Sequence, residues 1–406
     1  MPTAPVIHSD LPGSFAWTVF HERHPELVRR VLAALPYGPV ERAAVERLLA
    51  ESTTGVLEPL DPGAHDHAEW LARGEGLWGR PWGQAPFLWA ESYFYRRLLE
   101  ATGYFRAGAW QGVDPFAPFK AAELASAAVD QELAALRELP EAGRADALLT
   151  SALWGNRADL GFQLTAGAAG GPGGSGVLVD RRAALWGALE RGAGGRVCVV
   201  ADNAGRELLP DLALIDHLLT TGLAGTVDLY LKPQPYFVSD ATTADLLATL
   251  ERLRTGAGPI GRRLWRAMND GTLTARTHPF FCAPLPFHDL PAELRAEFSG
   301  ATMTILKGDL NYRRLVGDRH WPPTTGFAAA VDHFPSPVAA LRTLKSDVVV
   351  GLPAPLVADL DRTGEPWRTT GHHAVLQVHP ADGHRRRLGG PGQAPGGDAG
   401  PIGPAA

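Results

Sequence analysis

The sequence predicts an α/β fold in which a mostly parallel β-sheet, covered by helices, follows a helical N-terminal region. From about Glu22 to Thr150 the apolar residues recur at helical spacing, and no convincing strand is present. Beyond Gly176, short apolar runs alternate with helical stretches at 197–201, 227–231, 302–306, 347–351 and 374–378. Such alternation is typical of a mostly parallel sheet covered by helices.

The helical region contains two clear apolar stripes and a passage rich in tryptophan. The stripes consist of Leu27, Val28, Val31, Leu32 and Leu35, and of Leu124, Ala128, Val129, Leu133 and Leu136. The tryptophan passage, which includes Trp70, Trp78, Trp82 and Trp89, leads into a predicted helix over 86–98. Aromatic packing between helices explains most of that passage. For Glu91 and Arg96 the sequence favours a solvated face or an internal ion pair over catalysis.

Composition changes divide the chain into three parts. We expect a mainly α-helical domain over 1–150, an α/β domain over 151–380 and a disordered tail, rich in Gly and Pro, over 381–406. A glycine-rich stretch over 167–176 lacks the Lys-Ser or Lys-Thr ending of a phosphate-binding loop. We therefore interpret it as a flexible connection.

Charge and cysteine content exclude several classes of function. The 406 residues have a formal net charge of −6 and a pI near 6.2, so no basic field favours nucleic acid or an anionic membrane. The two cysteines, Cys198 and Cys282, support neither a disulfide framework nor a zinc cluster. The N-terminus resembles no signal peptide, and no apolar run has membrane length. These features predict a soluble cytoplasmic protein, and they leave its oligomeric state open.

Polar side chains accompany four of the predicted strands. Asp202 and Asn203 end the first strand, and Gly205 then precedes a helical pattern. A loop from Lys232 to Thr242 places Asp240 after the second strand. Clusters at 307–314 and at 342–345 follow the third strand and precede the fourth. Because the carboxyl ends of parallel strands meet at one edge of a sheet, we expect the first three clusters to converge there.

These residue types favour a site for a divalent cation and a phosphate. Carboxylate and amide oxygens are ligands for hard cations such as Mg²⁺ or Mn²⁺, and nearby Lys and Arg side chains neutralise phosphate. A cleft of this composition can transfer a phosphoryl group to water. The alternative for each cluster is a helix cap, a turn residue or a solvated charge. The repetition at successive strand ends favours a site.

Five motifs together resemble the metal-dependent damage-control phosphatase family, once a domain of unknown function, and in particular its sugar-phosphate phosphatase branch. The resemblance covers most of the chain. It rests on the segments 153–160 (Leu-Trp-Gly-Asn-Arg-Ala-Asp-Leu), 202–207 (Asp-Asn-Ala-Gly-Arg-Glu), 237–240 (Phe-Val-Ser-Asp), 307–313 (Lys-Gly-Asp-Leu-Asn-Tyr-Arg) and 342–345 (Arg-Thr-Leu-Lys). The last segment matches the Arg-Thr-x-Lys signature of that branch.

The resemblance implies a helical N-terminal region packed on a Rossmann-like, mostly parallel α/β/α sandwich. It implies that a divalent metal, Mn²⁺, Co²⁺, Ni²⁺ or Mg²⁺, is bound at the catalytic residues Asp202, Asn203 and Asp240. Residues expected to contact substrate are Glu207, Asp309, Asn311, Tyr312, Arg313 and Lys345. The implied activity is hydrolysis of a sugar phosphate of the fructose 1-phosphate or fructose 6-phosphate type, in a metabolite damage-control role. The general base is not identified.

An alternative activity is described for the same branch, namely transfer of a methyl group from S-adenosylmethionine to protein glutamates. A methyl donor needs an adenosine pocket with a Gly-rich turn after the first strand, whereas this turn carries Asp202 and Asn203. The other strand ends carry cations suited to phosphate. The sequence therefore favours attack by a metal-activated water on a small phosphate monoester.

Overall fold

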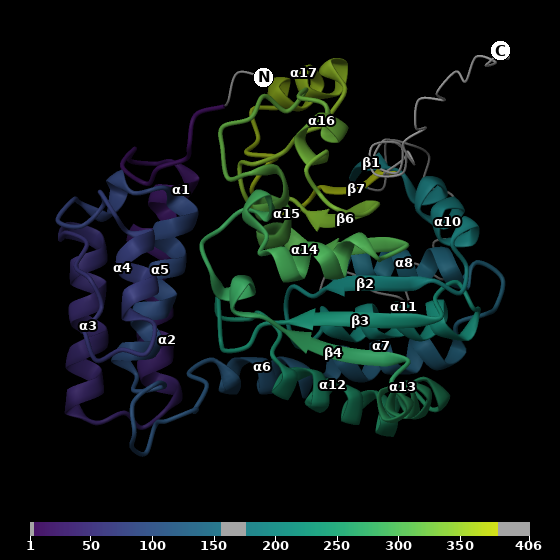
Figure 1. Ribbon diagram of the computed structural model, residues 1–406, viewed down its shortest axis with the longest axis horizontal. Coiled ribbons are helices and arrows are strands. Elements are labelled where there is room, and N and C mark those ends of the chain that lie inside the picture. Colours follow the sequence, from purple (N-terminus) through teal and green to yellow (C-terminus); the bar gives the residue numbers. More distant parts are fainter. Residues whose placement is uncertain (1–3, 156–175, 381–406) are drawn as a thin grey trace, which may run out of the picture.

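The computed structural model describes residues 4–155 and 176–380, which form a helical part beside an α/β part (Figure 1). Seven strands form one sheet in the order β1-β7-β6-β5-β2-β3-β4. All neighbouring pairs are parallel except β6 and β7. The strands are β1 (Val177–Asp180), β2 (Arg196–Val200), β3 (Thr226–Leu231), β4 (Leu273–Thr277), β5 (Met303–Lys307), β6 (Val338–Thr343) and β7 (Ala374–His379).

Helices α1 to α5 stand beside the sheet, and the remaining helices surround it, with α17 farthest out at the top (Figure 1). The first group is α1 (Phe15–Thr18), α2 (His24–Ala34), α3 (Pro39–Thr54), α4 (His67–Arg73) and α5 (Phe87–Ala101). The second is α6 (Ala117–Leu124), α7 (Ala127–Glu138), α8 (Arg144–Trp154), α10 (Arg182–Arg191), α11 (Leu208–Thr220), α12 (Thr243–Gly256), α13 (Pro259–Asp270), α14 (Ala292–Ser299), α15 (Gly308–Val316), α16 (Phe327–Val331) and α17 (Ala354–Arg362).

Strand β2 shows how the sheet separates two apolar cores. Side chains alternate between the faces of a strand. Val197 and Val199 pack with residues of α7, α8 and α10 to α13. Cys198 and Val200 pack on the opposite side, in the core that also contains α2, α5, α14 and α15. The sheet is therefore covered on both faces, as predicted for an α/β/α sandwich, and both cysteines are buried and free.

The fourth predicted strand, Asp347–Gly351, is wrong. These residues are irregular, and the strand paired with β5 is β6, whose Val-Ala-Ala-Leu run is less apolar. The segment is mostly buried because it packs against β6 and α15. Arg342 donates to the carbonyl of Val348, and the amide of Val350 donates to the hydroxyl of Tyr312. Arg342 and Thr343 thus end a strand, and Lys345 follows it at the same edge as Asp202.

The edge strands β1 and β4 were not predicted, since both are short and half-exposed.

The predicted division at residue 150 stays a prediction, and the described contacts cross it. Residues Val129, Leu133 and Leu149 of α7 and α8 pack in the core under the sheet. In the helical part, Trp70 and Trp89 lie 5.9 Å apart between ring centroids, which confirms the predicted aromatic packing. Glu91 and Arg96 both lie in internal ion pairs. The predicted tail and most of the glycine-rich stretch lie outside the described residues.

Buried His24 leads to a prediction about acid stability. Its ring stacks on Phe94 with centroids 3.7 Å apart, and burial, assisted by the charge of Arg23, lowers its pKa to about 3. The native state therefore binds fewer protons than the unfolded state below pH 6.5, so stability is lost as the pH falls. Between pH 7 and pH 5 we expect the parent to lose about 2 kcal/mol more unfolding free energy than His24→Phe.

Urea unfolding of both proteins at the two pH values measures this difference. The exposed His372 provides the control, because His372→Asn should keep the parent's pH dependence. Equal losses in the parent and in His24→Phe would contradict the assignment.

Candidate functional site

The candidate site lies at the carboxyl edge of the sheet, where the strand order reverses. From β2 the chain continues to β3 and β4 on one side, and it then returns to β5 and β6 on the other side of β2. The ends of β2 and β5 therefore flank the point where open α/β sheets bind ligands. Asp202 follows β2, and Gly308 with Asp309 follows β5.

The loops after β2 and β3 are joined by main-chain pairing. Asn203 and Asp240 form an isolated antiparallel bridge. The amide of Ala241 donates to the carbonyl of Asp202 at 2.8 Å, and the amide of Ala204 donates to the carbonyl of Ser239 at 2.7 Å. This pairing brings together Asp202, Asn203 and Asp240, as the sequence predicted from strand order.

The donor set fits a hard divalent cation. Asp202 and Asp240 are 7% and 2% exposed. Burial and the charge of Asp240 raise the pKa of Asp202 well above its usual range. Burial raises the pKa of Asp240 to about 6 despite Lys232, which lies 3.1 Å from its Oδ2. Apart from this ion pair, that oxygen has no hydrogen-bond partner among the described residues. Two buried carboxylates whose negative charge neighbouring cations do not fully neutralise are typical of a cation site.

The cation would be held by two carboxylates and one amide. Among residues 4–155 and 176–380, no three His, Cys, Asp or Glu side chains are grouped for a metal. The third candidate ligand is the amide oxygen of Asn203, which accepts from Ser239 Oγ at 2.7 Å. Amide and carboxylate oxygens suit Mg²⁺ or Mn²⁺ better than soft metals.

Gly308, directly after β5, leaves room for the carboxylate of Asp202, directly after β2. Its φ of +81° is in the left-handed region, and a Cβ there would lie 1.7 Å from Asp202 Oδ2. Only glycine adopts this backbone without strain and leaves room for the carboxylate.

A second group of charges lies beside the cation ligands. Lys345 Nζ lies 3.2 Å from Glu207 Oε1, and Asn203 Nδ2 donates to Glu207 Oε2 at 2.9 Å. Although burial opposes it, the charges of Glu207 and Asp202 raise the pKa of Lys345. The Lys345 side chain is 39% exposed, so this cation is accessible to a ligand.

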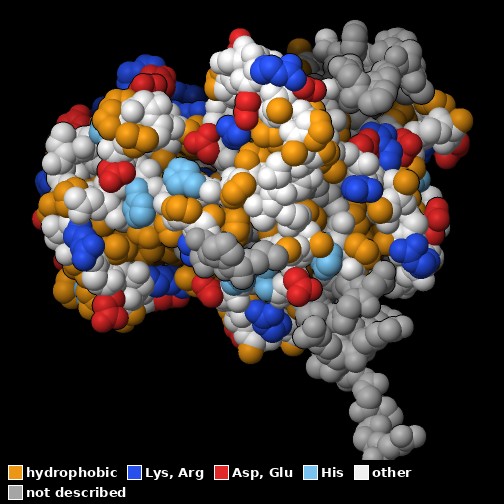
Figure 2. All heavy atoms as spheres, turned by 90° about the horizontal axis from the view of Figure 1, so that it is seen from above, with side chains coloured by type: hydrophobic (Ala, Val, Ile, Leu, Met, Phe, Trp, Pro, Cys, Tyr) orange, Lys and Arg blue, Asp and Glu red, His pale blue; other side chains and the backbone are white. Residues whose placement is uncertain are grey.

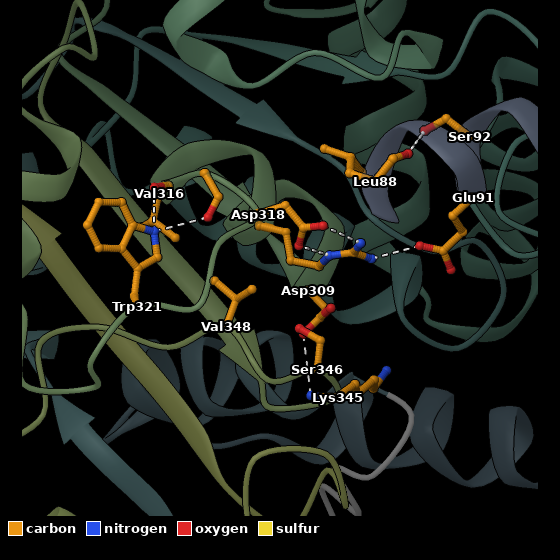
Figure 3. Close-up of polar contacts among 12 residues, drawn as sticks. Leu88, Glu91, Ser92, Asp309, Val316, Asp318, Trp321, Lys345, Ser346 and Val348 are labelled. Carbon is orange, nitrogen blue, oxygen red and sulfur yellow. Dashed lines mark hydrogen bonds and ion pairs between the residues drawn. The ribbon is translucent and has the colours of Figure 1, made fainter. Parts of the chain in front are cut away.

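Asp309 is held ionised next to Lys345 (Figure 3). Burial acts to raise its pKa, but Arg342 and Arg313 hold that pKa below the usual range. Its Oδ1 accepts from Arg342 Nε at 2.8 Å, from Ser346 Oγ at 3.1 Å and from the Lys345 amide at 3.3 Å. The described contacts of Asp309 all involve Oδ1, which leaves the lone pairs of Oδ2 for a ligand hydroxyl.

The remaining predicted substrate residues lie deeper in α15. Asn311 donates to the carbonyls of Ala201 and Lys307, which ties α15 to the end of β2. The hydroxyl of Tyr312 donates to Gln377 Oε1 at 2.9 Å. In these positions both side chains support the strand ends.

Arg313 lies between two carboxylates, those of Glu91 and Asp318, which Figure 3 labels. It donates to Glu91 of α5 at 2.9 Å and to both oxygens of Asp318. Burial raises the pKa of Glu91 to about 6, although Arg313 opposes that shift. The predicted substrate contact of Arg313 stays a prediction.

Sequence reasoning missed the contacts of Lys120 and Lys232 with Asp240, although a signal was present. The chain has four lysines among 38 lysines and arginines. Lys232 pairs with Asp240, Lys345 with Glu207, and Lys307 with Asp211 at the end of β5. Lys120 donates to the main-chain oxygen of Asp240 at 3.2 Å. Lys120, Lys232 and Lys345 thus contact residues of the candidate site, whereas Lys307 is held below the strand end by Asp211.

The described part of the face in Figure 2 shows no concentration of one charge. Figure 2 shows Lys, Arg, Asp and Glu side chains mixed with hydrophobic ones over the described part of the face in view. Within residues 4–155 and 176–380, no helix is long and apolar enough to cross a membrane. The motif residues from Asn156 to Leu160 lie outside the described part of the chain.

Comparison with known proteins decides the family. Residues 19–360 match the model of the damage-control phosphatase ARMT1-like domain. The chain belongs to this family. Damage-control phosphatase ARMT1 of Danio rerio is 29% identical over 90% of this chain and 94% of its own length. The Xenopus laevis protein of the same name is 31% identical over 73% of this chain and 75% of its own length.

One solved structure is also similar. A DUF89 family protein from Pyrococcus horikoshii aligns with 89% of this chain and 97% of its own, with a TM-score of 0.48 and 14% identity.

As a damage-control phosphatase family member, the chain is a phosphatase, and a small phosphate compound is the class of substrate that the family implies.

Proposed function

We propose that this protein is a metal-dependent phosphatase that hydrolyses sugar phosphates of the fructose 1-phosphate or fructose 6-phosphate type, in a metabolite damage-control role. The observation that supports this function best is that buried oxygen ligands and an accessible ammonium lie together at the carboxyl edge of the sheet. Asp202, Asn203 and Asp240 supply buried oxygen ligands, and Lys345 supplies an accessible cation within reach of Glu207.

Asp202, Asn203 and Asp240 would hold the divalent ion, Mn²⁺, Co²⁺, Ni²⁺ or Mg²⁺. When bound, such an ion polarises a phosphoryl oxygen and lowers the pKa of a coordinated water. The carboxylates supply the negative charge that the ion requires, and burial keeps bulk water from competing for it.

The other residues would orient the substrate. Lys345 carries its charge at the strand edge, where it neutralises a phosphate oxygen and stabilises the charge that develops during transfer to water. Asp309, ionised and held through Oδ1, would accept hydrogen bonds from sugar hydroxyls through Oδ2. Glu207 holds the Lys345 ammonium and the Asn203 amide in position.

Phosphate release from a panel of sugar phosphates, with each metal added singly, tests this proposal. We expect turnover with the fructose phosphates and its loss after chelation. Lys345→Met should lower kcat/KM about 100-fold, because one charged contact to the transferring phosphate disappears. A methyltransferase would instead stay active with chelator, and S-adenosylmethionine would raise its melting temperature.

Selective labelling provides a second measurement for Lys345. Its side chain is 39% exposed, whereas those of Lys120, Lys232 and Lys307 are 5%, 2% and 6% exposed. Pyridoxal 5′-phosphate with borohydride should modify Lys345 first, and inorganic phosphate should protect it. Labelling that phosphate does not slow would contradict a phosphate contact at Lys345.

A further inference from the structure

The loop that carries Asp240 has an unfavourable backbone conformation. Phe237 and Val238 have φ angles of 45° and 66°, in the left-handed region that non-glycine residues avoid. A β-branched side chain such as that of Val238 is especially disfavoured there. Such strain persists only where surrounding contacts hold the backbone in place.

Helix α6 of the N-terminal region supplies one of these contacts through Lys120. The Lys120 ammonium has three donors, and each has an acceptor. Nζ lies 2.9 Å from Asp114 Oδ2, 2.9 Å from Asp245 Oδ2 and 3.2 Å from the main-chain oxygen of Asp240. Lys120 therefore binds the main chain of the predicted cation ligand directly.

Asp245 connects Lys120 to the end of the same loop. Its Oδ2 accepts from the amide of Thr242 at 2.9 Å, and Thr242 Oγ1 accepts from the amide of Asp245. These two residues form the capping box that begins α12. Because the Lys120 side chain is 5% exposed, water does not substitute for it at this junction.

Helix α5 holds the beginning of the loop. Tyr236 donates its hydroxyl hydrogen to Ser92 Oγ at 2.7 Å. Ser92 in turn donates to the carbonyl of Leu88, as Figure 3 shows. The ring of Tyr95 stacks on Phe237 with centroids 4.8 Å apart. Contacts from α5 and α6 therefore lie on both sides of the two strained residues.

We propose that Lys120 and the Ser92–Tyr236 hydrogen bond are positioning elements, through which the N-terminal helices set the affinity of the Asp240 loop for a divalent cation. The expected effect on cation affinity rests on the proposed cation site. That these residues hold the loop rests on the loop contacts alone. Residues that orient metal ligands typically change metal affinity about 10–100-fold when they are replaced.

Two variants and one control test it. Lys120→Met removes the ammonium, and Tyr236→Phe removes one hydroxyl, a smaller change that leaves Ser92 bonded to Leu88. Arg252→Met is the matched control, because Arg252 of α12 donates to Leu124 of α6 and to Asp130 of α7 without reaching the loop.

Mn²⁺ affinity is measured by titration, and amide hydrogen exchange over 236–242 is measured in metal-free protein. We expect a Kd for Mn²⁺ about 10–100-fold higher in Lys120→Met, a smaller increase in Tyr236→Phe and the parent value in Arg252→Met. Loop exchange should accelerate in the first two variants only. At saturating Mn²⁺, kcat for phosphate release should fall in Lys120→Met and Tyr236→Phe, while their KM stays near the parent value.

The two proposals fail in different ways. A parent that binds no Mn²⁺ refutes the proposed cation site and with it the effect on affinity, and the metal-free exchange data then show only whether Lys120 and Tyr236 hold the loop. Parent-like loop exchange in Lys120→Met and Tyr236→Phe would overturn the inference, even if the parent binds Mn²⁺ tightly. If Lys120→Met does not fold, Tyr236→Phe decides between these outcomes.

Discussion

Asp202→Asn should lower kcat/KM for phosphate release by at least about a thousandfold, because a cation ligand at a buried site contributes several kcal/mol to the transition state. The same substitution should not destabilise the metal-free protein. Burial, together with the charges of Asp240 and Glu207, raises the pKa of Asp202 well above its usual range, so the carboxylate is costly to keep charged. The amide has the same shape and no charge.

Phosphate release with saturating metal and thermal unfolding with chelator measure the two halves of this prediction. We expect the metal-free variant to unfold at the parent's temperature or above it. Added Mn²⁺ should raise the unfolding temperature of the parent and not that of the variant. A variant that retains most of its turnover would exclude Asp202 as a ligand of the required ion.

Gly308→Ala should damage both the fold and the activity. At a φ of +81° an alanine costs about 1–2 kcal/mol, and its Cβ would lie 1.7 Å from Asp202 Oδ2, so that carboxylate must move. Overpacking of this kind costs a further 1–3 kcal/mol or so. Displacement of a reacting group by about 1 Å lowers turnover about 100-fold. Denaturant unfolding and phosphate release measure the two effects.

Gly271 provides the matched control. It has a φ of +80°, and a Cβ there would meet nothing within 4 Å. Gly271→Ala should therefore lose about 1 kcal/mol of stability and no activity. If both alanine variants behave alike, backbone strain explains the loss at Gly308, and the close approach to Asp202 has no functional role.

The central part of the fold was predictable because its signals are local. The buried run ending at Val200 is uniformly apolar, and Asp202 interrupts it. The same reasoning failed at 347–351, since an apolar run indicates burial without specifying strand pairing. Edge strand β4 carries Thr and Arg on its half-exposed faces and therefore lacks that apolar signal.

The sequence predicted which residue types form the candidate site, but it predicted only part of how they are arranged in space. Parallel strand ends bring Asp202, Asn203 and Asp240 to one edge, and the main-chain pairing of their loops agrees with that prediction. Spacing could not show that Arg313 faces Glu91, because those residues are 222 positions apart. The four lysines were visible in the sequence, but the carboxylate that each one pairs with was not.

The sequence by itself determined the α/β class, the candidate oxygen ligands and the family motifs, because each depends on residue type and on short spacing. The tertiary structure alone decided which charges are neutralised and which stay accessible. Lys232 and Lys307 are buried against carboxylates, whereas Lys345 has similar neighbours and stays 39% exposed. Burial and pairing depend on residues brought together from distant parts of the chain, and these set the charge that each group presents to a ligand.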